Sequence, residues 1–326
     1  MSFSRLVSTA ALAVGLPFAA NAETLTVEAV QALFSSAQLV SAPIEVECTL
    51  SGGAETTCIQ ITVVPEPATY EAGPWCPTNV DDGPENAGIW FYDGEVVDAD
   101  GEFFSKLSAL YGDENWQVFD PDTGEVFYTA TLEGCEAAAR PDVAEEYQNH
   151  CVQCLLEYYP DTTVTYSFPV EPVAADADTD IRETGVGVAL NGVRIDGPAP
   201  VEAILSAYTI AAFDDCGGHV NPHVGYHYHA VTDCIEGDDH VHQEVHAPVV
   251  GLALDGHFVV SHLNADGSAP SDLDDCYGHT TADLGYHYHA GAAESNQILG
   301  CLSAQVGCST GEEGEACDAT ARRQRP

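Results

Sequence analysis

Apolar residues in the first half of the chain repeat at two different spacings. In residues 24–39 they recur every three or four positions, which predicts an amphipathic helix. Residues 58–64 and 125–130 are short runs of β-branched and aromatic residues bounded by Gly and Pro, as is typical of strands. Residues 142–157 predict a second helix. No catalytic constellation is visible in this half, where His150 stands alone and is interpreted as structural.

The second half contains two apolar segments of the same form. Residues 187–195 and 251–259 each read as a strand interrupted by Asn-Gly or Asp-Gly. This dipeptide favours a tight hairpin, because the turn needs residues that tolerate positive φ. Residues 201–208 predict a short helix after the first hairpin.

A histidine-rich segment follows each predicted hairpin. Residues 214–230 and 274–290 are identical at eleven of seventeen positions without a gap. The repeated residues are mostly His, Tyr, Asp and Cys rather than apolar core residues, which indicates a duplicated functional site. We therefore predict two internal repeats, about 187–230 and 251–290, that pair about a pseudo-twofold axis into one β-rich domain.

Each repeat ends in a Tyr-His-Tyr-His strand. Alternation places both histidines of such a strand on one face and both tyrosines on the other. The two imidazoles start about 6.6 Å apart and can converge on one metal ion at about 2.0–2.1 Å. A third histidine lies eight residues earlier, on a glycine-flanked loop that can fold back. The predicted ligands are His219, His227 and His229 in the first repeat, and His279, His287 and His289 in the second.

Several points about these sites stay open at this level. The histidines could instead form hydrogen bonds within a polar core. As metal sites, the two triads could be separate or could face each other around two ions. Copper is favoured because it outranks zinc for imidazole ligands, and zinc is the alternative. The acidic residues expected to accept hydrogen bonds from the ring nitrogens are Asp214, Asp215, Asp274 and Asp275.

Further histidines lie beside the triads. His246 leads into the second repeat and is a candidate fourth ligand. His240 and His242 lie in an acidic loop and form either an auxiliary metal site or a solvated segment. His257 and His262 occur in the second repeat only and are interpreted as structural.

The first 22 residues predict a secretory signal peptide. A positively charged start precedes a short apolar run, and Ala20-Asn21-Ala22 has the form of a cleavage site. No later stretch is apolar enough for a membrane span, so we expect a periplasmic or secreted protein.

All twelve cysteines follow this segment, and an even number in an exported chain predicts disulfides. Cys151 and Cys154 are interpreted as two structural half-cystines rather than a redox pair. The expected pairs around the histidines and at the C-terminus are Cys216 with Cys234, Cys276 with Cys301, and Cys308 with Cys317.

The chain has 52 acidic and 8 basic residues, for a net charge of −44. Phosphate groups would be repelled, so nucleic acids and anionic lipids are excluded as partners. Residues 98–101 and 120–124 faintly resemble calcium loops but lack the full ligand spacing. We interpret them as solvated turns with weak calcium binding at most.

The predicted fold class is mainly β, with the duplicated, disulfide-stapled domain preceded by a smaller α+β or β-rich domain that also contains disulfides. The expected boundaries are 1–22 for the signal peptide, 23–168 for the N-terminal domain, 169–180 for a linker and 181–326 for the duplicated domain. The role of the N-terminal domain is not indicated by its sequence.

The motifs of the second half also carry a family resemblance. They are Leu190 to Val193, Cys216 with Gly218-His219, Tyr226 to His229, His246, Ala253 to Gly256, Asp274 to Cys276, Gly278-His279, Tyr286 to His289 and Gly300-Cys301. Together they resemble the YHYH-domain family of exported bacterial and eukaryotic proteins, over about residues 186–302. The resemblance implies the domain and no particular activity.

Three functions are compatible with these residues. The first is an exported metal-binding protein, with copper as the favoured ion, in metal binding or handling. The second is a copper-dependent oxidoreductase with a mononuclear or dinuclear histidine site. The third is a disulfide-stapled surface or matrix module in which the histidines are structural. Whether the chain is an enzyme is left undecided.

Overall fold

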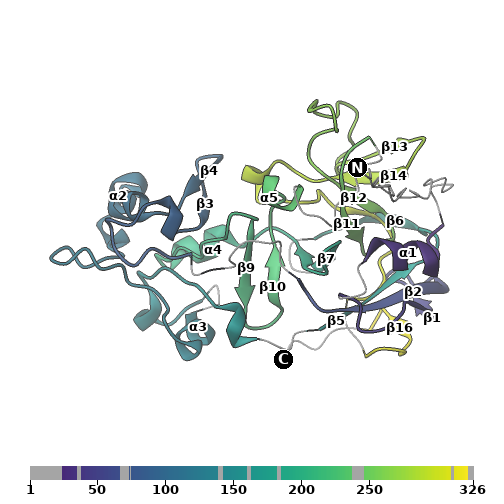
Figure 1. Ribbon diagram of the computed structural model, residues 1–326, viewed down its shortest axis with the longest axis horizontal. Helices are drawn as coiled ribbons and strands as arrows, with labels where there is room; N and C mark the ends of the chain where they lie inside the picture. The colour runs from purple at the N-terminus through teal and green to yellow at the C-terminus, as the bar shows by residue number, and fades with distance from the viewer. Residues whose placement is uncertain are drawn as a thin grey trace, which may run out of the picture.

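The computed structural model describes residues 24–34, 38–66, 73, 75–138, 142–159, 163–181, 185–236, 246–309 and 312–321. The predicted signal peptide and the pair His240 and His242 lie outside these residues. The described chain is mainly β, as predicted, with several sheets joined by short helices (Figure 1).

The central feature is an eight-stranded sheet. Its strands are β7 (Gly185–Ala189), β8 (Arg194–Asp196), β9 (Gly218–Asn221), β10 (Gly225–Tyr228), β11 (Val249–Ala253), β12 (Phe258–Val260), β13 (Gly278–Thr281) and β14 (Gly285–His289). The strand order is β13-β14-β12-β11-β7-β8-β10-β9. Strands β7 and β11 pair antiparallel at the centre, and the histidine-bearing strands lie at the two ends.

The two predicted hairpins are confirmed. Strands β7 and β8 pair antiparallel around Gly192, and β11 and β12 pair antiparallel around Gly256. These glycines have φ values of 80° and 91°, which L-residues rarely adopt. A parallel histidine strand joins each hairpin, β10 beside β8 and β14 beside β12. After the first hairpin, α4 (Val201–Ser206) lies where a short helix was predicted.

The N-terminal residues share hydrophobic cores with the central sheet. Strands β1 (Ile44–Thr49), β2 (Glu55–Val63) and β5 (Val164–Pro169) form a sheet with the C-terminal β16 (Cys317–Asp318). Helix α1 (Val27–Leu33) and this sheet share a hydrophobic core with β7, β11 and β12.

Residues 75–158 form a separate lobe beside β9 and β10 (Figure 1). The lobe contains α2 (Gly101–Tyr111), α3 (Leu132–Ala138) and the hairpin β3 (Ile89–Tyr92) and β4 (Glu95–Asp98). It shares the largest core with the first half of the central sheet. The reason is visible at Ile89, which bridges to Phe213 next to the first histidine segment.

Three local predictions differ from the structure. The helix predicted over residues 24–39 is shorter, since α1 ends at Leu33. Residues 142–157 contain the 3-10 turn Glu145–Tyr147 and run into a second, Leu156–Tyr158, with a bridge at Cys151 in place of a helix. The expected linker contains β6 (Ala174–Thr179), which pairs with β15 (Leu302–Ala304). At Cys151 and in β6, pairing with residues distant in sequence overrides the local pattern.

Six disulfides join all twelve cysteines: Cys48–Cys58, Cys76–Cys151, Cys135–Cys154, Cys216–Cys234, Cys276–Cys301 and Cys308–Cys317. All three predicted pairs are present, and Cys151 and Cys154 belong to different structural bridges. This density of disulfides is typical of an oxidising compartment. Among the described residues, none of the helices has the length and apolar character to cross a membrane.

Candidate metal centres

Three histidines meet at the β9–β10 end of the central sheet. His227 lies directly opposite His219 in the antiparallel pair, and His229 follows at the end of β10. The ring centroids lie 4.7–5.1 Å apart. One nitrogen of each ring lies within 4.8 Å of the others, so these three residues can share one ion. We call them the three-His cluster.

The three-His cluster is buried. His227 is 2 % exposed and His229 is 5 % exposed. The Phe213 ring lies 4.7 Å from the His219 ring and 5.5 Å from the His229 ring, between centroids. Phe213 in turn packs on Phe91 of the N-terminal lobe. The lobe therefore helps to bury this cluster, which gives a structural role to a region whose sequence indicated none.

Burial makes these imidazoles neutral. Loss of solvation lowers the pKa of His229 to about 3, and neighbouring His227 adds to the effect. The same loss of solvation lowers the pKa of His219 well below its usual value and also lowers that of His227. Neutral imidazole is the form that binds metals.

Four histidines meet at the opposite end of the sheet. His279 and His287 face each other across β13 and β14, His289 ends β14, and His246 arrives from the segment before β11. Their Nε2 atoms lie close together: His246 to His287 3.0 Å, His279 to His287 3.1 Å, His279 to His289 3.2 Å, and His246 to His289 3.3 Å. We call these residues the four-His cluster.

The remaining ring nitrogens of the four-His cluster all have oxygen partners. Nδ1 of His287 donates to the Gly285 carbonyl and Nδ1 of His289 donates to the Ser261 carbonyl, each at 2.9 Å. The other two Nδ1 atoms lie against carboxylates: His279 with Asp272 Oδ1 at 2.9 Å, and His246 with Asp283 Oδ2 at 3.2 Å. With the protons on Nδ1, all four Nε2 lone pairs point at one another.

This arrangement fits a metal ion. A tetrahedral ion with bonds of about 2.0–2.1 Å to nitrogen needs ligand atoms about 3.3–3.4 Å apart. Four of the six Nε2 separations are 3.0–3.3 Å, close to that value, and all four ligand atoms lie within 4.8 Å of one another. Burial lowers the pKa values of His287 and His289 to about 4. Near neutral pH, these two rings are therefore neutral and their Nε2 lone pairs are free to bind a cation. A cation in the middle removes their repulsion.

The same second-partner pattern occurs in the three-His cluster. Nδ1 of His227 donates to the Gly225 carbonyl at 2.9 Å, and Nδ1 of His229 donates to the Gly197 carbonyl at 2.6 Å. His219 forms a hydrogen bond with the backbone of Ala211. Such partners fix the tautomer and the orientation of a metal-binding imidazole.

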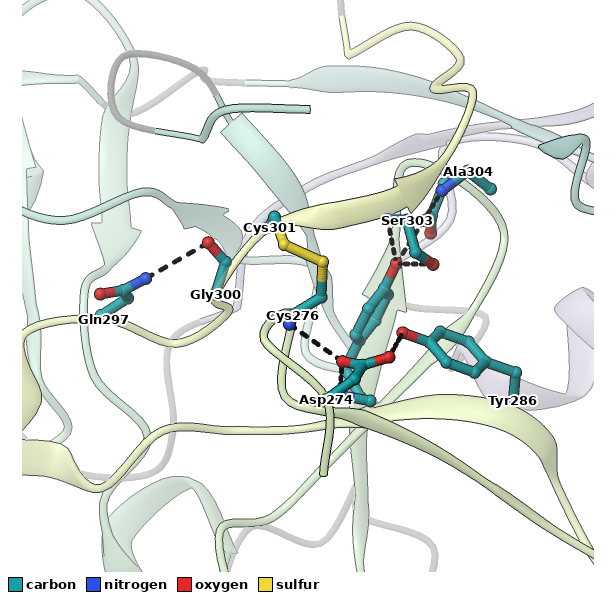
Figure 2. The surroundings of a disulfide bond; sticks show 11 residues. Asp274, Cys276, Tyr286, Gln297, Gly300, Cys301, Ser303 and Ala304 are labelled. Atoms are coloured by element: carbon teal, nitrogen blue, oxygen red, sulfur yellow. Dashed lines mark hydrogen bonds between the residues drawn. A yellow bond between two sulfur atoms is a disulfide. The ribbon is translucent and has the colours of Figure 1, made fainter. Parts of the chain in front are cut away.

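The aspartates of the repeated Asp-Asp-Cys loops have a different place from the one we expected. Asp274 Oδ1 accepts hydrogen bonds from the backbone of Cys276 and Gly278, and its Oδ2 accepts one from the Tyr286 hydroxyl at 2.7 Å (Figure 2). Asp214 makes the corresponding bonds with Cys216, Gly218 and Tyr226. Asp215 and Asp275 are exposed. Asp214 and Asp274 thus shape the loop that precedes each third histidine.

Glycine is required inside this loop. A Cβ atom on Gly278 would lie 2.1 Å from the Tyr286 hydroxyl, and one on Gly218 would lie 2.6 Å from that of Tyr226. The tyrosine therefore packs directly over the loop that the aspartate holds. The disulfide Cys276–Cys301 ties the same loop to the strand β15 (Figure 2).

The third histidine of each cluster was expected on a loop but lies on a strand. His219 belongs to β9 and His279 to β13, each paired with the histidine strand. Four strands lie between β10 and β14, so the two clusters are separate. The alternative of one centre built by six facing histidines does not match this arrangement.

The tyrosines of both repeats point to the other side of the sheet, as alternation predicted. Tyr228 accepts a hydrogen bond from Asn191, and Tyr288 donates one to Asp255. The His257 ring packs edge-on against Tyr288 on that side.

Three carboxylates near the clusters were not singled out from the sequence. They are Asp272 and Asp283 at the four-His cluster, and Asp196, whose Oδ2 lies 3.9 Å from His227 Nε2. One signal existed for Asp283, which replaces His223 of the first repeat. In the acidic loops compared with calcium sites, Asp100 caps α2 and Asp120 accepts bonds within its own turn.

Residues 165–272 match the model of the YHYH protein family. The matched range contains the whole three-His cluster and His246, and it ends before the second Asp-Asp-Cys loop. It starts earlier and ends earlier than the resemblance seen in the motifs alone. No curated protein and no solved structure matches the chain.

Proposed function

From the geometry of the two clusters, we propose that the protein is an exported transition-metal-binding protein that holds one ion at each histidine cluster. Copper is the favoured element because it ranks highest for imidazole sites, and zinc is its competitor. The six disulfides support an extracytoplasmic location.

The observation that carries the proposal is the convergence of four Nε2 atoms whose rings all have an oxygen partner on Nδ1. Two such imidazoles cannot form a hydrogen bond with each other, because neither Nε2 carries a proton. A hydrogen-bonded polar core would place donors opposite acceptors. Four acceptors around one point are the arrangement of a cation site.

The two sites belong to two copies of one structural unit in this proposal. Equivalent residues make equivalent contacts: His227 and His287 with Gly225 and Gly285, and Asp214 and Asp274 with their loops. Gly217 and Tyr277 share the left-handed conformation at the same loop position. A non-glycine residue in that conformation supports a common ancestry for the two loops.

Metal binding or handling is favoured over catalysis at the four-His cluster. Four imidazoles complete a tetrahedral coordination sphere, which leaves no position for a substrate. The tyrosines that could exchange electrons with a copper ion lie on the opposite side of the sheet and bond to Asn191 and Asp255. We therefore assign the four-His cluster to binding.

Metal analysis of the exported chain, purified without a histidine tag, tests this proposal. We expect about two transition-metal ions per chain, as purified or after reconstitution with copper and zinc supplied together. His223→Ala is the matched control, since His223 is exposed in the β9–β10 turn and belongs to neither cluster. A chain that stays free of metal after reconstitution would leave the histidines a structural role and overturn the proposal.

A further inference from the structure

We propose that the two clusters select ions of different charge: the four-His cluster takes a divalent cation, and the three-His cluster takes monovalent copper. This inference rests on the proposed metal-binding function and names the ion for each site. Its basis is a difference in charge and coordination between two sites with the same histidine strands.

The four-His cluster has two negative charges in direct contact with its ligands. The carboxylates of Asp272 and Asp283 accept from the rings of His279 and His246. The side chains of Asp283 and Asp272 are 39 % and 71 % exposed, so both carboxylates remain in contact with water. The two carboxylates balance the charge of a divalent ion held by the four rings.

In the three-His cluster, each ring forms its hydrogen bond with a neutral backbone group. The backbones of Gly225, Gly197 and Ala211 bind its rings. Phe213 lies against two of the rings, and His227 and His229 are buried. Because uncompensated charge in an apolar site is costly, a divalent ion is disfavoured here relative to a monovalent one.

The charged groups described beside the three-His cluster cancel each other. Asp196 Oδ2 lies 3.9 Å from His227 Nε2, but Asp196 Oδ1 accepts a bond from Arg194 Nε at 2.5 Å. Arg194 is 8 % exposed, so the pair is held inside the fold as one neutral unit. In the second half, Phe258 and Val260 occupy the same positions on β12. The ion pair is therefore specific to the three-His end.

Coordination number points the same way. Zinc and divalent copper need at least four donors, which the four-His cluster provides from the protein alone. Monovalent copper has a filled d shell and accepts three nitrogen donors in a plane. The three-His cluster offers three imidazoles and no fourth histidine among the described residues.

A two-metal titration tests the inference. The metal-free full chain is titrated with zinc, a divalent probe that cannot change its oxidation state, and then with monovalent copper held in a competing chelator without oxygen. We expect one equivalent of zinc, lost in His287→Ala and kept in His227→Ala. One equivalent of monovalent copper should then bind the zinc-loaded protein, with the X-ray absorption edge of a three-coordinate ion.

The result that overturns the inference is two equivalents of zinc with affinities within about tenfold of each other, or monovalent copper that displaces zinc and leaves the three-His cluster empty. Binding of neither ion would instead contradict the proposed function itself. A second variant avoids the buried histidines: Asp272→Asn with Asp283→Asn should weaken zinc about 10–100-fold and leave monovalent copper unchanged. Equal weakening of both ions would also count against selection by charge.

Discussion

The three-His and four-His clusters share the Tyr-His-Tyr-His strand, the opposing histidine and the Asp-Asp-Cys loop, yet their surroundings differ. The N-terminal lobe covers the three-His cluster through Phe213, and its rings bond to backbone groups. The four-His cluster gains His246, whose side chain is 23 % exposed, and has two carboxylates.

This difference shows which part of each site the repeated motif encodes. The motif supplies three imidazoles on one face of a hairpin, and that part is the same at both ends of the sheet. Residues outside the motif supply the rest: the carboxylates and the fourth imidazole at the four-His cluster, and the Phe213 ring at the three-His cluster. Two sites built on one motif can therefore have different affinities and different ions.

Metal saturation of both clusters should produce the largest change, an increase in the melting temperature. An ion present at 1,000 times its dissociation constant stabilises the folded state by about 4 kcal/mol per site. With both sites filled, we expect an upward shift of the melting temperature of more than about 10 °C relative to chelator-treated protein. Calorimetry with and without chelator measures it, and an unchanged melting temperature would contradict two occupied sites.

Removal of one buried histidine should affect only its own cluster. Structural zinc binding of about 10–16 kcal/mol shared by four ligands gives about 3–4 kcal/mol each, or about 100–1,000-fold in affinity. We expect His287→Ala to lose this much at the four-His cluster, while the three-His cluster keeps its ion. His223→Ala serves as the control, and loss of both ions from a folded His287→Ala protein would mean that the clusters are not independent.

The carboxylates should have a smaller effect, confined to one end. Asp272 is exposed, and its contact with His279 Nδ1 makes that ring a better ligand. Asp272→Asn should weaken divalent-ion binding about 10–100-fold with little change in the folding of the chain. Asp275→Asn is the matched control, since Asp275 is exposed on the neighbouring loop. Isothermal titration of both variants with zinc measures this difference, and equal affinities in the two variants would contradict the role of Asp272.

The pH dependence of the metal-free protein should distinguish the buried histidines. The pKa of His229 lies at about 3 and those of His287 and His289 at about 4 in the folded state, below the usual 6.5. Between about pH 6.5 and 4, the unfolded chain binds more protons, so stability falls as the pH falls. Each of these histidines should cost about 1–2 kcal/mol between pH 7 and 5.

Urea unfolding of the metal-free chain at the two pH values measures this loss. His287→Ala should lose less stability than the wild type over the same interval. A wild-type chain that becomes more stable between pH 7 and 5, with no difference in the variant, would show that these rings are not buried as neutral imidazoles.

The sequence predicted the parts of both sites that depend on local spacing. Alternation in residues 226–229 and 286–289 placed the histidines on one face, and the Asn-Gly and Asp-Gly turns predicted the hairpins. The disulfides around the clusters also followed from the sequence, because two cysteines bracket each histidine segment.

The rest depends on contacts that no local pattern encodes. Asp283 meets the ring of His246 from a segment 37 residues away, and Asp272 meets His279 across seven residues. Asp196 reaches His227 through the parallel pairing of β8 with β10. The aspartates that the repeat made prominent, Asp214 and Asp274, hold loops instead. Repetition marked them as important without showing which group they bind.

The number and type of atoms around the ion in the four-His cluster decide whether its four histidines bind one metal ion. X-ray absorption fine structure on zinc-loaded His227→Ala protein isolates that cluster. We expect four imidazole nitrogens at about 2.0–2.1 Å from the zinc ion and no other donor. A coordination sphere with two or fewer imidazoles, filled by oxygen, would contradict it and would return the four histidines to a structural role.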